Sequence, residues 1–328
     1  MNGEIDIEKG SIIMKRNEGL TQNVSISSET ETKQKLSVIV GQTVKTGIIK
    51  SNLIPMFAGL TLAMYKSQYG LLEKLPEIIF ATVGTALVIG AAGAFNNAYD
   101  RDIDAIMERT KSRPTATGVM SLKATLILAT VMALLGLGSL FAASPLASLM
   151  GFLGLFFYVV PYTMWTKRHT VWNTEVGSIS GAMPPLIGWA AISNDIFHPA
   201  SLGLFIVMVI WQMPHFYAIA IRKQLDYKSA GVPMLPVAKG MRRTYIQSNV
   251  YLILLIASSV LFSGLSMGIM LVALLLNVAW LVLSIYGYRN MEQEKWAKIM
   301  FIYSLLHMMI LFGTVICYSL IGIIFKLY

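Results

Sequence analysis

Asn96, Asp100 and Asp104 stand four residues apart at the end of a long apolar run. At 3.6 residues per helical turn, these three side chains stack on one face of a helix. Two carboxylates and an amide oxygen form a set of hard oxygen donors that suits Mg²⁺, which commonly binds through few carboxylates together with substrate phosphates. A solvated, charged helix end is the structural alternative. Ionisable residues beside a membrane span are costly, however, and are usually functional.

Basic residues follow this motif. Arg109, Lys111 and Arg113 precede a turn over residues 114–118. Guanidinium and ammonium groups bind phosphate oxygens well, and a divalent cation neutralises the charge that develops on a leaving diphosphate. The chemistry that this loop indicates is therefore the handling of a diphosphate ester.

A second polar stretch, residues 211–237, follows another apolar run and is rich in proline. Its candidate site residues are His215, Arg222, Lys223, Asp226 and Tyr227. The carboxylate would join the metal site, the two cations would neutralise phosphate, and the tyrosine would contact substrate. The histidine, which lies among aromatic residues, has two interpretations: a hydrogen-bonded packing residue, or a porphyrin contact or iron ligand.

A third polar group, residues 167–175, opens a further apolar run. Asn173 and Glu175 are interpreted as caps of the helix that begins there. The sequence Met183-Pro184-Pro185 then bends or breaks that helix inside the membrane. Such a break either lines a cavity or is a structural kink.

The elements that position these residues are membrane helices. Of 328 residues, 55% are hydrophobic and 13% are charged, which is far too few charged residues for an ordinary soluble protein. Apolar runs of about 20 residues can cross a bilayer. The sequence predicts an all-α polytopic protein with nine such runs, near 47–66, 77–100, 122–142, 145–165, 174–193, 200–222, 247–267, 269–288 and 298–324. Eight is the alternative count, because only residues 263–268 separate the seventh run from the eighth.

The distribution of basic residues favours nine. With the N-terminus on the cytoplasmic side, 23 of the 26 Lys and Arg residues lie on that side, as the positive-inside rule requires. The C-terminus then lies outside. The net charge of +9 is thereby explained by topology and by contact with anionic lipid or phosphate, and nucleic acid is not an expected partner. Residues 1–45 are predicted to be a polar, disordered cytoplasmic tail that precedes a transmembrane domain over 46–328.

These motifs resemble the UbiA-type intramembrane prenyltransferases, whose signature is an Asn and two Asp residues spaced by four. The stretches NNAYDRDIDAIMERTKSRPTATG (96–118), GAMPPLIGWAA (181–191) and MPHFYAIAIRKQLDYKSAGVPMLPV (213–237) are similar to the heme-farnesylating subgroup. The resemblance covers about residues 40–325. It implies a nine-helix bundle around a central cavity with a polar cytoplasmic opening, in agreement with the topology.

The implied reaction moves the farnesyl group of farnesyl diphosphate onto a vinyl group of heme B, with addition of water. The resemblance also implies that Asn96, Asp100, Asp104 and Asp226 hold diphosphate through Mg²⁺. Arg109, Lys111, Arg113, Arg222 and Lys223 are then the phosphate contacts. The second acidic motif of the wider superfamily is reduced here to Asp226, which leaves open whether one Mg²⁺ or two are bound.

Two other functions stay open at this point. A related enzyme that prenylates an aromatic quinone precursor would share the diphosphate chemistry. A cation-coupled transporter would use the carboxylates differently, although transporter sites lie near mid-membrane. The expected setting is the bilayer of a bacterial plasma membrane, with a heme A synthase or the assembly of a terminal oxidase as a possible partner.

Overall fold

The computed structural model describes residues 6–8, 11–13 and 35–327. Near the N-terminus, β1 (Asp6–Glu8) pairs antiparallel with β2 (Ser11–Ile13). From Leu36 onward the described chain is helical, beginning with α1 (Leu36–Thr43). Most of the predicted tail over 1–45 lies outside the described residues. The prediction of an all-α membrane domain is confirmed.

Eight helices in the described part of the chain are long and apolar enough to cross a membrane. They are α2 (Thr46–Lys66), α3 (Leu75–Tyr99), α5 (Leu122–Ala143), α6 (Pro145–Phe157) continued by the π-helix η1 (Tyr158–Thr166), α9 (Pro199–Arg222), α11 (Leu235–Ser258) continued by η2 (Ser259–Phe262), α12 (Met267–Asn290) and α13 (Gln293–Phe325). The predicted seventh and eighth spans are thus separate helices. The seventh begins at Leu235 rather than near residue 247, and it has a kink at Gly240, whose φ is 75°.

The remaining predicted span, 174–193, is a broken helix. It consists of α7 (Asn173–Gly181) and α8 (Met183–Ala190), with Ala182 between them. Pro184 and Pro185 lack backbone N–H groups, so the helical hydrogen bonding of α7 is not continued through them. Each half is too short to cross a bilayer alone, which is why the structure has eight continuous spans and one divided one.

The broken helix packs closely against α2. A Cβ atom added at Gly59 would lie 2.0 Å from the carbonyl oxygen of Pro185, and one added at Gly188 would lie 2.0 Å from that of Met56. Small residues at membrane helix crossings allow the backbones to approach in this way. The contact therefore fixes α8 beside α2 at the level of the break.

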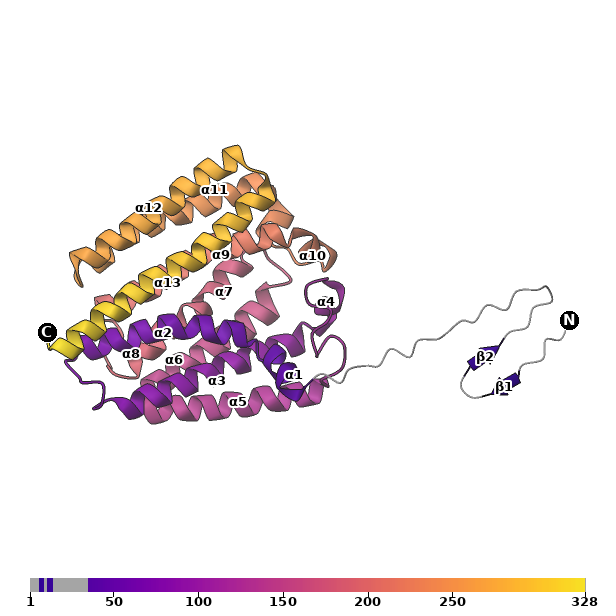
Figure 1. Cartoon of the computed structure of the whole chain (residues 1–328), viewed down its shortest axis with the longest axis horizontal. Helices are drawn as coiled ribbons and strands as arrows, with labels where there is room; N and C mark the ends of the chain where they lie inside the picture. Colours follow the sequence, from indigo (N-terminus) through magenta and orange to yellow (C-terminus); the bar gives the residue numbers. More distant parts are fainter. Residues whose placement is uncertain (1–5, 9–10, 14–34, 328) are drawn as a thin grey trace. The chain divides into compact units, whose positions relative to one another are not determined.

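Two short helices outside the spans follow the two polar loops. They are α4 (Arg101–Ile106) after α3 and α10 (Gln224–Ser229) after α9. Figure 1 shows both at the same end of the bundle, opposite to the end at which the C-terminus lies. The two predicted constellations are therefore brought to one side, as their common charge pattern indicated.

Candidate active site

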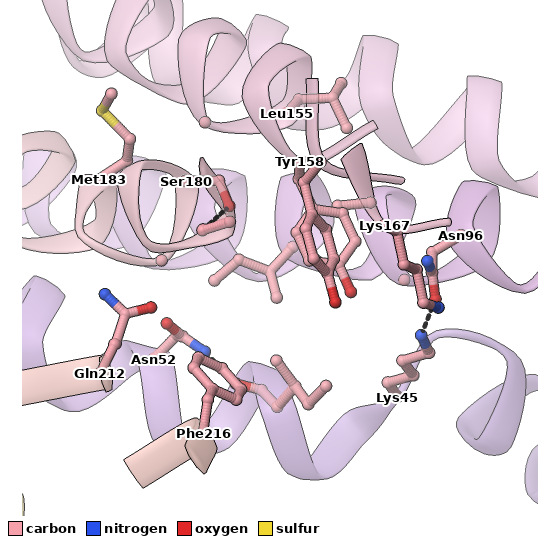
Figure 2. A pocket seen from close by; sticks show the side chains of 18 of the residues that line it. Lys45, Asn52, Asn96, Leu155, Tyr158, Lys167, Ser180, Met183, Gln212 and Phe216 are labelled. Atoms are coloured by element: carbon pink, nitrogen blue, oxygen red, sulfur yellow. Dashed lines mark hydrogen bonds between the residues drawn. The ribbon is translucent and has the colours of Figure 1, made fainter. Parts of the chain in front are cut away.

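A cavity of about 350 Å³ opens among α2, α3, α6, η1, α7, α8 and α9. One end is polar and is lined by Lys45, Asn96, Asp104, Arg109, Arg113 and Lys167. Most of the remaining wall is apolar or aromatic, with Val88, Leu155, Tyr158, Tyr162, Met183, Ile187 and Phe216 among its residues. Figure 2 shows Lys45, Asn96 and Lys167 together, away from Met183. The cavity thus has a charged head region and an apolar tail region.

The predicted stacking of the acidic motif is confirmed. Helix α3 ends at Tyr99 and α4 starts at Arg101, yet backbone hydrogen bonds continue through the bend, from the Asp100 amide to the Asn96 carbonyl (2.9 Å) and from the Asp104 amide to the Asp100 carbonyl (2.8 Å). The Asn96 side-chain amide donates to the Asp100 carboxylate at 2.7 Å. Both carboxylates are buried.

Each buried carboxylate is paired with a cation. The Lys167 ammonium binds the Asp100 carboxylate, and the Arg113 guanidinium binds Asp104 at 2.6 Å. Breaking a buried ion pair by removing one partner is strongly destabilising, because the other charge is left without compensation. The loop after η1 and the loop after α4 are therefore both tied to the acidic motif.

Lys45 completes the charged head. It precedes α2 in a left-handed conformation (φ 58°), and its ammonium donates to the Asn96 side-chain oxygen. Burial holds the pKa of Lys45 well below its ordinary value, and the positive charges of Arg113 and Lys167 lower it further. An anion in the head region would reverse this effect, since an opposite charge nearby favours the protonated amine.

Asp102, on the other face of the motif, serves a different purpose. The Arg168 guanidinium donates to both of its carboxylate oxygens, at 2.7 Å each. The hydrogen bond from Arg168 holds the pKa of Asp102 below its ordinary value. This pair lies outside the cavity lining and fastens the loop that carries Lys167 to α4.

The structure sorts the other predicted contacts into two groups. Arg109, Arg113 and Tyr227 line the cavity, where they could contact a substrate. Asp100, Lys111, Arg222, Lys223, His215 and Asp226 are not among the lining residues, although Asp100 contacts two residues that are, Asn96 and Lys167. Lys111 instead pairs with Glu108 at the surface, with an Nζ–Oε2 distance of 2.7 Å, and the Arg222 guanidinium lies 5.0 Å from the centre of the Phe301 ring.

Asp226 is not gathered with the acidic motif in this structure, and its part in a metal site stays a prediction. Within the described residues, no group of three or more His, Cys, Asp or Glu side chains is placed to hold a metal ion, so Asp226 does not meet Asp100 and Asp104. The physical reason is local. Successive residues of a helix point about 100° apart, and in α10 it is Tyr227 that faces the cavity.

His215 is placed beside the cavity in a packed environment. Its ring stacks on Trp211 and Phe301, with centroid distances of 4.8 and 5.2 Å, and its Nδ1 lies 2.6 Å from the Ser304 hydroxyl. Phe216, which does line the cavity, meets the His215 ring edge-to-face at 5.3 Å. The contacts of His215 are therefore those of a packing residue. Among the described residues, its ring touches the cavity lining only through Phe216.

Glu175 does not cap a helix, contrary to prediction, and Asn173 donates from its side chain to the Thr170 carbonyl (2.8 Å). The Glu175 carboxylate accepts hydrogen bonds from the Tyr217 hydroxyl and from the Gln247 amide (2.7 Å). It thereby links α7 to α9 and α11. No local pattern indicated this contact, because the three residues lie far apart in the chain.

Sequence reasoning also missed several lining residues. Lys45 precedes the first span, and Lys167 belongs to the group that was interpreted as a helix start. Tyr158 and Tyr162 come from η1, where a π-helix replaces the expected α-helical continuation. Tyrosines four apart in an apolar run were a usable signal, whereas nothing local distinguishes Lys45 from other basic residues in the N-terminal region.

The head region suits a metal only in combination with a ligand. Asp100, Asp104 and Asn96 supply two carboxylates and an amide, and no third acidic group completes the set among the described residues. Mg²⁺ is commonly bound by one or two carboxylates together with phosphate oxygens. The donor set therefore fits Mg²⁺ that is shared with a bound phosphate ester, and four nearby cations would bind the rest of its charge.

Comparisons with known proteins agree with this geometry. The sequence model described as the UbiA prenyltransferase family matches residues 52–306. Protoheme IX farnesyltransferase 2 of Lysinibacillus sphaericus strain C3-41 is 67% identical, over 96% of this chain and all of the relative. Protoheme IX farnesyltransferase 1 of Bacillus cytotoxicus is 64% identical, over 90% of this chain and 97% of the relative. The protoheme IX farnesyltransferase of Shouchella clausii is 59% identical, over 94% and 100%.

Solved structures share the fold. A UbiA homologue from Archaeoglobus fulgidus bound to DMAPP and Mg²⁺ superposes with a TM-score of 0.68 and 13% identity, over 87% of this chain and 98% of the other. A structure concerned with digeranylgeranylglyceryl phosphate synthase gives a TM-score of 0.68 and 14% identity, over 86% and 98%. At these identities the likeness establishes the arrangement of helices alone.

Proposed function

This chain belongs to the UbiA prenyltransferase family and, within it, groups with the protoheme IX farnesyltransferases, and on that premise we propose that it transfers the farnesyl group of farnesyl diphosphate to a vinyl group of protoheme IX. Addition of water to the product gives heme O, and diphosphate is released. The observation that carries the proposal is the division of one cavity into a cationic head and an apolar tail, which matches a prenyl diphosphate.

The head region binds the diphosphate. Lys45, Arg109, Arg113 and Lys167 supply four positive charges against the buried Asp100 and Asp104. Charge-assisted hydrogen bonds in a water-poor site are stronger than those in bulk solvent. Mg²⁺ held by Asn96, Asp100 and Asp104 would neutralise charge on the leaving diphosphate.

Binding exchanges ionic partners. Asp100 and Asp104 would hold the metal, and Lys167 and Arg113, which now pair with those carboxylates, would then be free to bind phosphate oxygens. Their positive charge would then lie near the allylic C–O bond that breaks, where it stabilises the developing diphosphate anion. Arg168 keeps its bidentate pair with Asp102 throughout, so the loop stays in place while Lys167 changes partner.

The tail region protects the allylic carbocation that forms when the diphosphate leaves. Tyr158, Tyr162 and Phe216 line the cavity. Figure 2 shows Phe216 across from Tyr158. Aromatic faces attract cations, and an apolar wall excludes water that would capture the cation early. His215 positions Phe216 through ring contact, which is the role we propose for it.

The cellular setting follows from the same proposal. The eight apolar helices found in the described residues make this a multi-pass membrane protein. We place it in a bacterial plasma membrane with the head region and the N-terminus on the cytoplasmic side, because that side holds the basic residues. Heme B is the acceptor, and a heme A synthase or the assembly of a terminal oxidase would use the product.

The deciding experiment identifies the product. Membranes that carry the wild-type chain or the Asp100→Ala variant receive heme B, farnesyl diphosphate and Mg²⁺, and the extracted hemes are identified by mass. Heme O is expected from the wild type alone. If folded wild type yields none, a panel of aromatic acceptors tests quinone prenylation, and cation uptake into proteoliposomes tests transport.

A further inference from the structure

Two carboxamides interrupt the apolar wall of the cavity. Gln212 enters from α9 and Asn52 from α2, and both are lining residues. In the view of Figure 2 the oxygen of each carboxamide is turned toward the other side chain. Neither side chain takes part in the charged head region, so the diphosphate chemistry does not account for them.

The Gln212 carboxamide has a fixed orientation. Its Nε2 donates to two backbone carbonyls, those of Ser178 (3.1 Å) and Met208 (2.9 Å). Both amide hydrogens are thereby used, and among the described residues no donor reaches Oε1. Space for this oxygen depends on Gly181, because a Cβ atom there would lie 2.0 Å from Oε1. The Gln212 side chain is therefore held in place with its carbonyl oxygen, Oε1, free to accept a hydrogen bond beside the cavity.

Asn52 has the same arrangement on the other wall. Its Nδ2 donates to the Ile48 carbonyl at 2.9 Å, and no donor in the described chain reaches its Oδ1. Along α2 it lies seven residues after Lys45, which is about 10 Å deeper into the bundle at 1.5 Å per residue. The Asn52 carbonyl oxygen, Oδ1, is therefore a second hydrogen-bond acceptor without a donor, and it lies beyond the head region.

Both carbonyl oxygens belong to cavity-lining residues and lack a donor from the described chain, so their hydrogen-bond partner must come from the cavity. Water fits this requirement, because buried waters usually bind polar groups that lack other partners. A water that donates one hydrogen to each carboxamide has its lone pairs free. It is therefore oriented as a nucleophile.

We propose that Gln212 and Asn52 position the water molecule that hydrates the prenylated vinyl group. The inference rests on the proposed function and assigns the source of its hydroxyl group. Both residues act as positioning residues, and neither transfers a proton.

The step balances as follows. The allylic C–O bond breaks and its electron pair leaves with diphosphate. The vinyl π electrons form the new C–C bond between the terminal vinyl carbon and the farnesyl group, which leaves a cation at the inner vinyl carbon. The positioned water forms a C–O bond there and loses one proton to the diphosphate. Without that water, the cation loses a proton from the adjacent CH₂ group and becomes an alkene.

The test measures the ratio of hydroxylated to alkene heme in wild type, Asn52→Leu and Gln212→Met, with each product normalised to the diphosphate released. Replacing either acceptor removes one hydrogen bond to the water, so the alkene share should rise roughly fivefold. Asn290→Leu is the matched control, because Asn290 also donates to the carbonyl four residues earlier (Tyr286, 2.7 Å) but does not line the cavity.

An unchanged ratio in both variants overturns the inference, whether or not total turnover falls, because loss of folding lowers both products together. A rise in alkene that is equal in Asn290→Leu also overturns it. If the wild type makes no prenylated heme from either route, it is the proposed function that has failed. These outcomes are distinguishable from the same mass analysis.

Discussion

The two polar loops of this protein have similar composition and different structural roles. Both mix acidic and basic residues and both contain proline, and both lie at the same end of the bundle. In the first loop Asp100 and Asp104 are buried and each binds a cation. In the second loop Asp226 is half-buried, has no ion pair among the described residues, and does not line the cavity.

The difference teaches that a carboxylate becomes part of this site only where a cation meets it. A buried charge without a partner is strongly unfavourable. Arg113 lies only nine residues from Asp104, but the other two cations come from distant elements. Lys167 is 67 residues from Asp100 in the chain, and Lys45 is 51 residues from Asn96. Within the part of the chain that the structure describes, no cation pairs with Asp226, and the second loop contributes Met234 and Tyr227 to the cavity wall.

The largest expected effect is in the first loop. Asp104→Asn keeps the shape of the side chain but removes the charge that binds Arg113 and that would hold the proposed metal. We expect kcat to fall by about 10²- to 10³-fold, the usual loss for one group that stabilises the transition state. Product formation in reconstituted vesicles measures it. Near-normal turnover by a folded variant would contradict a metal role for this carboxylate.

The next largest effect is expected for Lys45, the cation that contacts Asn96 at the first loop. Lys45→Met removes a charge next to the bound diphosphate, whereas its present partner, Asn96, is neutral. KM for farnesyl diphosphate should rise about 10- to 100-fold, the value of a charge-assisted hydrogen bond. Lys111→Met is the control and should change KM less than about twofold, because Lys111 pairs only at the surface.

The affinity for farnesyl diphosphate should depend on pH through the charge of Lys45. The pKa of Lys45 is lowered in the free protein, and a bound diphosphate raises it. Between the two pKa values, binding takes up a proton, so affinity falls as pH rises through that range. Calorimetry in two buffers of different ionisation enthalpy measures the uptake. Lys45→Met should abolish it, and an equal uptake in that variant would assign the proton to another group.

The smallest effect is expected in the second loop. Asp226→Asn should leave kcat within about twofold, because this carboxylate neither lines the cavity nor pairs with a cation among the described residues. The same product assay measures it. A loss as large as that of Asp104→Asn would show that α10 turns Asp226 into the site when substrate binds, and the contrast between the loops would then fail.

Much of the fold was determined by the sequence alone. Apolar length fixed the spans, the two prolines after Met183 fixed the break between α7 and α8, and a four-residue spacing brought Asn96 against Asp100 at 2.7 Å. These features depend on helix geometry and bilayer thickness, which act on neighbouring residues or on a single run.

Only the tertiary structure decided which charged residues share the site. It brought in Lys45 and Lys167, left out Lys111 and Asp226, and gave Glu175 hydroxyl and amide partners on two other helices. The physical reason is that helical periodicity is a local property of the chain. Whether Asp100 meets Lys167 depends instead on how elements 67 residues apart in the chain pack together.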